Sequence, residues 1–124
     1  MKSAVAVAVV AAAMVLGGCA STAKSDAPNS SDLMLKALNA QSAGNPTLAS
    51  RYYNDVIELD PRNKLAYYNL GLIAESQENY AVAEDNFRVA LGIDPAFELA
   101  RKSLTKVQAL RAARQSSEHI VHAP

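Results

Sequence analysis

The chain has no tryptophan and a single cysteine in 124 residues, with only five glycines and five prolines. One cysteine cannot form an intramolecular disulfide, so a framework stapled by disulfides is excluded. The 12 basic and 12 acidic residues balance, which argues against a strong electrostatic field for nucleic acid or anionic lipid. The scarcity of helix breakers, together with abundant alanine and leucine, favours helices. A chain of this length forms one small domain at most.

No apolar run is long enough to cross a bilayer. The longest extends from Ala4 to Leu16 and follows a single positive charge at Lys2. Because a spanning helix needs about 20 apolar residues, this run is too short for a stable transmembrane helix. Its length fits the apolar region of a signal peptide, and the small residues Gly17 and Gly18 suit a cleavage site. Residues 1–18 are therefore predicted to be an export signal.

The lone cysteine directly follows this segment. The stretch Leu16-Gly17-Gly18-Cys19 resembles the lipobox of bacterial lipoproteins, in which the cysteine becomes the first mature residue. The resemblance implies a diacylglyceryl thioether on Cys19, and two or more acyl chains give stable anchoring. The residue after the cysteine is Ala20 and not Asp, and in the resembling family this implies a location at the periplasmic face of the outer membrane if the cell is Gram-negative. In any other bacterium the implied location is the outer face of the plasma membrane. The alternative is an ordinary secretory signal cleaved elsewhere, with Cys19 a coincidental thiol.

Small and polar residues follow the cysteine. Residues 19–30 include Pro28 and too little apolar surface to fold, which predicts a disordered tether. As a flexible coil, this tether has an r.m.s. span of about 20 Å. Any folded part would then lie close to the membrane.

The rest of the chain repeats itself with a period of about 34 residues, which lies in the range of repeat proteins. The segment VIELDP at 56–61 aligns with ALGIDP at 90–95, and this offset defines one repeat period. Between the two copies, apolar residues align with apolar residues, small residues with small residues, and the Asp-Pro pair with the Asp-Pro pair. The aligned pairs include Ala49 with Ala83, Tyr53 with Phe87, Ile57 with Leu91 and Leu59 with Ile93.

This period and pattern are similar to the tetratricopeptide repeat, a pair of antiparallel helices. The residues at positions typical of that family are Ala49, Tyr53 and Pro61 in the first copy and Tyr67, Leu70, Gly71, Ala83, Phe87, Ala90 and Pro95 in the second. The resemblance implies an all-α fold, a short right-handed α-solenoid of two helix pairs plus a C-terminal capping helix. The expected segments are a first repeat at 31–63, a second at 64–97, the capping helix at 98–118 and a disordered tail at 119–124. Helices are expected near 31–43, 46–59, 63–77, 80–92 and 96–116.

Individual residues in this pattern have clear physical roles. Gly71 and Ala83 are small where two helices are expected to cross, because a bulky side chain would hold the backbones apart. Asn45 before Pro46 is typical of a helix N-cap followed by proline at the first helical position. Asn79 stands one repeat period further on and predicts an equivalent cap.

In the resembling family, the first helix of each pair lines a concave groove that binds peptides or helices. By position, the residues of this groove are Met34, Leu38, Tyr68, Asn69, Leu72, Lys102 and Lys106. The resemblance implies one groove that is apolar at its N-terminal end and basic at its other end. It also implies that Asn69 is placed to hydrogen-bond a ligand backbone. A basic clamp for a C-terminal carboxylate is not expected, because its positions hold Met34, Leu38, Leu99 and Ser103. The simpler alternative is a set of half-exposed side chains and a solvated helix face.

No residue pattern predicts catalysis, and no cofactor or metal is expected. His119 and His122 lie in a polar C-terminal stretch, and a zinc site needs three or four ligands. The only thiol would be acylated, and there is no glycine-rich phosphate loop. The chain is thus expected not to be an enzyme.

Two functions remain. The favoured one is a membrane-anchored adaptor that binds an unknown envelope protein or peptide; relatives by resemblance include pilotin-like factors and scaffolds for cell-wall enzymes. The alternative is a self-assembling structural subunit. Residues 64–95 are net negative and 96–118 net positive, so head-to-tail contact between copies could exploit this asymmetry.

Overall fold

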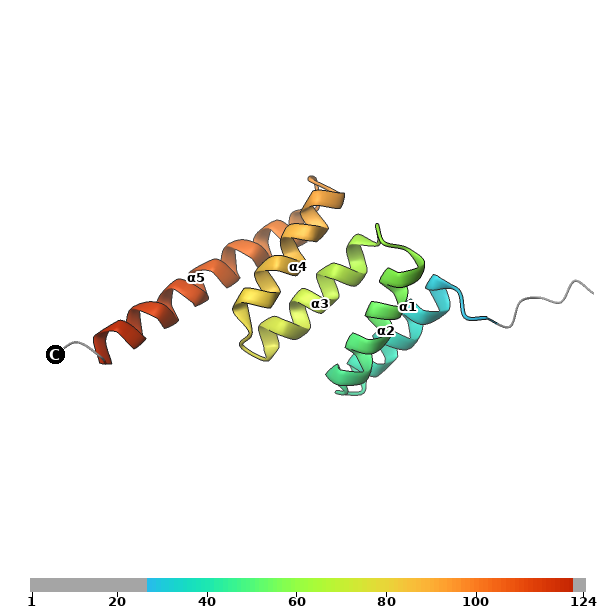
Figure 1. Ribbon diagram of the computed structural model, residues 1–124, viewed down its shortest axis with the longest axis horizontal. Helices are drawn as coiled ribbons and strands as arrows, with labels where there is room; N and C mark the ends of the chain where they lie inside the picture. Colours follow the sequence, from blue (N-terminus) through green and yellow to red (C-terminus); the bar gives the residue numbers. More distant parts are fainter. Residues whose placement is uncertain (1–26, 122–124) are drawn as a thin grey trace, which may run out of the picture.

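The computed structural model describes residues 27–121, which form five helices (Figure 1). Their bounds are α1 Ser30–Ser42, α2 Pro46–Leu59, α3 Lys64–Ser76, α4 Tyr80–Ile93 and α5 Glu98–Val121. The expected export signal, Cys19 and most of the expected tether lie outside the described residues.

The helices pack in order along the chain. α1 pairs with α2 and α3 with α4, while α3 also packs on α2, and α5 packs mainly on α4 (Figure 1). Each element therefore buries its apolar face against its neighbours in sequence, as in a solenoid. The expected fold, a short solenoid of two helix pairs with a C-terminal helix, is confirmed.

Asparagine side chains begin three of the helices. The side-chain oxygens of Asn29, Asn45 and Asn63 accept hydrogen bonds from the backbone N–H groups of Asp32, Leu48 and Ala66, at 2.9, 3.0 and 3.1 Å. These bonds satisfy N–H groups that the first turn of a helix leaves unpaired.

The prediction of a matching side-chain cap at Asn79 is wrong. Asn79 does occupy the N-cap position of α4, but its side chain makes no capping bond. Since this residue is exposed, water can satisfy the free N–H groups instead.

The turn between the paired helices contains a residue with positive φ in both repeats. In the first repeat it is Gly44, with φ of 73°, and one repeat period later it is Glu78, with φ of 58°. Glycine adopts this left-handed conformation without steric cost, whereas Glu78 does so with its carboxylate paired to Arg114.

The core has one fully buried aromatic ring in each repeat. Tyr53 and Phe87 are both 0 % exposed. The Tyr53 hydroxyl donates to Oε1 of Gln41 at 2.6 Å, which satisfies the buried polar atom. Burial raises the pKa of Tyr53 above its ordinary value. Phe87 lies directly over Gly71, where a Cβ atom would be 2.5 Å from the ring atom Cε1.

The two ends of the stack carry polar residues at positions that are apolar or small in the middle. Ala66 and Ile73 are buried in the cluster that includes Tyr53, and their equivalents one repeat period earlier, on α1, are the exposed Asp32 and Asn39. A preceding helix would therefore find no apolar face at these positions on α1. Polar terminal faces of this kind keep a repeat stack soluble and finite.

α5 ends the stack in the same way. Its exposed Arg101, Thr105 and Gln108 stand one repeat period after positions on α3 that are half-buried or buried. An additional helix packed on this face of α5 would therefore meet polar side chains.

α5 also extends further than predicted, since it remains helical through Val121. The expectation of a disordered tail is wrong for residues 119–121, because neither glycine nor proline interrupts the helix there. Ser116 and Ser117 also hydrogen-bond to backbone carbonyls of their own helix. The remainder of the tail, including His122, lies outside the described residues.

Candidate functional site

Six of the seven predicted groove residues, all except Asn69, fall into two columns that recur at the repeat period across α1, α3 and α5. One column holds Met34, Tyr68 and Lys102, and the other holds Leu38, Leu72 and Lys106. On each helix the two columns are one helical turn apart, which places them on one face. The candidate surface, called the strip below, therefore runs over the first helix of each pair and α5.

The strip is apolar on α1 and α3 and basic on α5. Met34, Tyr68 and Leu72 are half-buried, whereas Leu38 is 43 % exposed. Further exposed leucines lie one residue or one turn from the columns, at Leu35, Leu65 and Leu99. Exposed apolar groups of this kind, when contiguous, mark interaction sites on soluble proteins.

The Tyr68 ring is held in place by two other aromatic rings. Its centroid lies 5.7 Å from that of Phe87 and 5.1 Å from that of Phe97, and both pairs are tilted. These are distances at which aromatic pairs attract. Lys64 lies over the Phe97 ring at 5.1 Å and also pairs with Asp94. Tyr68 is thus fixed by the second repeat and by the turn before α5.

Asn69 is less available to a ligand than the sequence suggested. Its side-chain Nδ2 donates to the backbone carbonyl of Leu65 at 2.8 Å. Asn86 makes the same bond to Val82 in α4. One of the two Nδ2 hydrogens of Asn69 is therefore used within its own helix, which leaves Oδ1 and the other N–H for a ligand.

The two predicted lysines differ in their surroundings. Lys106 forms an ion pair with Glu75 of α3, and this hydrogen bond raises the pKa of Lys106. Lys102 is exposed and has no acidic partner among residues 27–121. Lys102 is thus the more available cation of the strip, and Lys106 shares its charge with a neighbour.

A cluster that was not predicted from the sequence holds α5 in place. Glu84 of α4 is only 5 % exposed and pairs with Arg88 of its own helix and Arg111 of α5. Gln108 donates to the same carboxylate at 3.3 Å. The Arg111 hydrogen bond, followed by that of Gln108, lowers the pKa of Glu84 although burial opposes this. Through this cluster α4 fixes the helix that carries Lys102 and Lys106.

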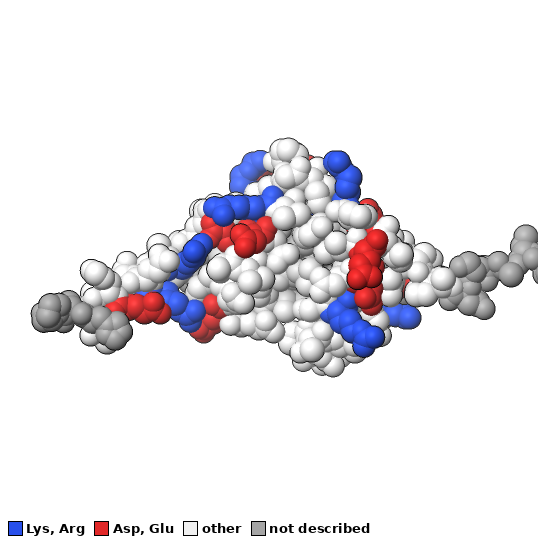
Figure 2. Space-filling model, in the orientation of Figure 1, with Lys and Arg blue, Asp and Glu red and all other residues white. Residues whose placement is uncertain are grey.

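The charge asymmetry between 64–95 and 96–118 is largely neutralised inside the molecule. Lys106, Arg111 and Arg114 of α5 pair with Glu75, Glu84 and Glu78. Figure 2 accordingly shows basic and acidic side chains interleaved along α5. Much of the attraction expected between copies is already satisfied within one chain, which weakens the basis of the head-to-tail hypothesis.

Residues 27–121 contain neither a candidate metal site nor a candidate membrane-spanning helix. Within 27–121, no group of three or more His, Cys, Asp or Glu residues is placed to hold a metal ion. None of the helices in this part of the chain is both long and apolar enough to cross a membrane. His119 lies in the last turn of α5.

The sequence comparison identifies the family. Residues 34–96, half of the chain, match the tetratricopeptide repeat. The chain belongs to the tetratricopeptide repeat family. Domains of this family serve as scaffolds that bind other proteins and are typically not enzymes. A comparison with curated proteins gives no match.

Proposed function

We propose that this tetratricopeptide repeat protein is an exported, lipid-anchored adaptor of the bacterial cell envelope. Its strip on α1, α3 and α5 binds a segment of another envelope protein. The observation that carries the proposal is the pair of columns on this strip, Met34, Tyr68 and Lys102 beside Leu38, Leu72 and Lys106, which pass from apolar to basic. A partner segment with an apolar stretch followed by acidic residues complements this order.

The lipid anchor rests on the sequence around Cys19. The lipobox-like Leu16-Gly17-Gly18-Cys19 and the preceding apolar run at 4–16 support export and acylation. Cys19 is close in sequence to the first described residue, Ala27, so a protein anchored there has its first repeat near the lipid surface. The strip would then face proteins that lie close to the same membrane.

Two observations argue against the alternative of a self-assembling subunit. The ends of the stack carry Asp32 and Asn39 on one side and Arg101 and Gln108 on the other, which are poor faces for stacking a second copy. Several of the charges that could attract copies are paired internally, as in Lys106 with Glu75 and Arg111 with Glu84. Sedimentation at high concentration and low salt tests this, and a monomer is expected.

The binding surface is tested by crosslinking and pull-down from cell envelopes with the full-length chain. Lys102→Glu and Tyr68→Ala are expected to lose a partner that wild type retains. Because Tyr68 packs on Phe87, Leu38→Ser is a third variant that leaves the aromatic contacts intact. Val89→Ala, at an exposed position on α4, is the matched control and should keep the partner. The same partners on all variants would contradict the assignment of the strip.

The anchor is tested separately with Cys19→Ala. The variant should appear in the aqueous phase on detergent partition, whereas the wild-type protein enters the detergent phase. A Cys19→Ala protein that still fractionates with membranes would rule out the thioether anchor, without bearing on the binding strip.

A further inference from the structure

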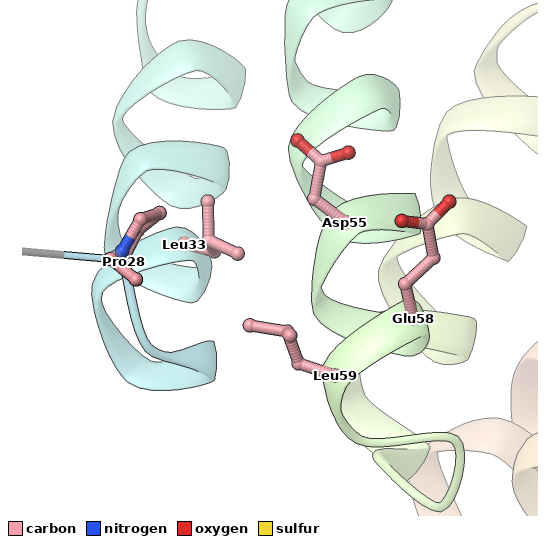
Figure 3. A pocket seen from close by; sticks show the side chains of 6 residues that line it. Pro28, Leu33, Asp55, Glu58 and Leu59 are labelled. Atoms are coloured by element: carbon pink, nitrogen blue, oxygen red, sulfur yellow. The ribbon is translucent and has the colours of Figure 1, made fainter. Parts of the chain in front are cut away.

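A hollow lies between the beginning of α1 and the end of α2, away from the strip described above. Its volume is about 290 Å³, and it is lined by Ala27, Pro28, Leu33, Asp55, Glu58 and Leu59. In Figure 3, Leu59 points from α2 toward Leu33 and Pro28, and the two carboxylates follow one another along α2. The hollow therefore has an apolar floor and one acidic wall.

The hollow reflects a difference between the two repeats. Leu33 stands one repeat period before Tyr67, whose larger side chain is half-buried in the second repeat. An aromatic ring at this position takes up space that leucine leaves open. Asp55 and Glu58 likewise correspond to Val89 and Gly92, so the second repeat has no carboxylate at these positions. The combination of an open apolar floor and an acidic wall belongs to the first repeat alone.

The acidic wall has no partner in the part of the chain that the structure describes. All six ion pairs there join residues between Lys64 and Arg114. Neither Asp55 nor Glu58 forms an ion pair or a side-chain hydrogen bond within residues 27–121. Within residues 27–121 these two carboxylates thus lack a cationic partner, while Glu75, Glu78 and Glu84 of the second repeat are paired.

We propose that this hollow binds a polypeptide segment of a partner protein in which an aromatic side chain neighbours a lysine or arginine. In the second repeat, the Tyr67 ring occupies the position equivalent to Leu33, so an aromatic side chain of the partner is the expected occupant of the hollow. Asp55 and Glu58 lie one helical turn apart on α2 and line the hollow, so their negative charge favours a cation next to that ring. The proposal does not depend on the strip or on the lipid anchor.

The test uses the ¹⁵N-labelled full-length chain with Cys19→Ser, titrated with blocked pentapeptides and followed by NMR. The probe has the sequence Ser-Phe-Arg-Lys-Ser, and two control peptides replace its phenylalanine by alanine or its two cations by glutamates. The probe is expected to bind with a dissociation constant of about 1 mM and to shift signals of Leu33, Asp55 and Leu59. Both control peptides should bind more weakly.

Three variants of the protein complete the test. Leu33→Tyr copies the second repeat and should weaken binding about tenfold by filling the space, and a thermal melt checks that the core around the buried Leu33 still folds. Asp55→Asn combined with Glu58→Gln should weaken binding about fivefold, as expected for partly exposed charge pairs. Asp85→Asn removes an exposed carboxylate from α4 and should change nothing.

Several results would overturn the proposal. These are no shift at millimolar probe, shifts confined to the strip, equal binding of the control peptides, and unchanged binding to the Leu33→Tyr or double-carboxylate variants. Concentration-dependent shifts at the hollow without any peptide would also overturn it, because a second copy would then be the occupant.

Discussion

Arg111 of α5 donates to Glu84 of α4, with 2.8 Å between Nη1 and Oε2. The two residues are 27 positions apart in the sequence and lie where the last helix packs on the second repeat. Arg88 neutralises the same carboxylate from its own helix. A buried carboxylate held by two guanidinium groups is costly to disturb, because removal of the acceptor leaves charged donors without a partner.

Glu84→Gln is expected to lower the free energy of unfolding by about 1–2 kcal/mol, since both arginines lose a charged acceptor. Urea denaturation at neutral pH measures the change. Glu98→Gln, which breaks the exposed pair with Arg101, is the control and should cost less than about 0.5 kcal/mol. Equal losses for the two variants would show that Glu84 does not secure α5.

The same carboxylate predicts how stability depends on pH. The hydrogen bond from Arg111 holds the pKa of Glu84 below its ordinary value of 4.5. The native state therefore binds this proton less readily than the unfolded chain. The contribution of Glu84 is complete above pH 4.5 and is lost as pH falls through its lowered pKa. Between about pH 5 and pH 3, wild type should lose more stability than Glu84→Gln, and parallel profiles would refute this.

Gly71→Ala is expected to destabilise the protein by about 1–3 kcal/mol through overpacking. Its new Cβ atom would stand 2.5 Å from the Phe87 ring, which is fully buried and cannot move freely. Gly92→Ala is the matched control in α4, because nothing lies within 4 Å of its Cβ position. That variant should be neutral or stabilising by up to about 1 kcal/mol, as alanine is the better helix former. Thermal denaturation of both variants decides the matter.

Tyr53→Phe should cost about 0.5–1.5 kcal/mol, because it removes the hydroxyl that donates to Gln41 in a fully buried position. Phe87 shows that a phenyl ring fits at the equivalent place, so the loss reports the hydrogen bond and not the packing. Tyr52→Phe, at a half-buried neighbouring position, is the control and should cost less. A loss for Tyr53→Phe no greater than for the control would contradict a structural role for this bond.

Shortening α5 separates its docked part from its free end. A chain that stops after Arg114 should keep its stability within about 0.5 kcal/mol, because the described residues beyond it are exposed. A chain that stops after Leu110 should lose about 2 kcal/mol, since Arg111 and Arg114 no longer reach Glu84 and Glu78. Differential scanning calorimetry of the two truncated chains measures the difference. A large loss for the longer chain would show that the end of α5 contributes to stability.

The helix pairs could be predicted because their signals are local and recur at a fixed interval. Ala49 and Ala83 mark the crossings, and the Asp-Pro pairs at 60–61 and 94–95 mark the turns. Asp60 and Asp94 in fact make the same bond, accepting from the backbone N–H groups of Arg62 and Ala96 at 3.2 and 3.0 Å. Spacing alone is enough to place such features.

The details that could not be predicted depend on side-chain direction. Nothing local indicates that Glu84 meets Arg111, or that Lys106 pairs with Glu75, because each pair joins different helices. α5 ends later than predicted, since polar composition at a terminus is typical of disorder as well as of a solvated helix. The hollow beside Leu33 could not be predicted either, because its volume depends on how the side chains of α1 and α2 pack together.

Asp32 and Asn39 lie exposed at one end of the described stack, and Arg101, Thr105 and Gln108 lie exposed at the other, so both end faces are polar. Joining further repeats to either terminus would press polar groups into a new seam. A duplicate of residues 64–97 inserted just before Glu98 would leave both end faces untouched, but Glu84 of the first copy would then face the equivalents of Ala74 and Gln77 and lose Arg111. Lengthening the stack by insertion therefore also requires a new partner for that carboxylate.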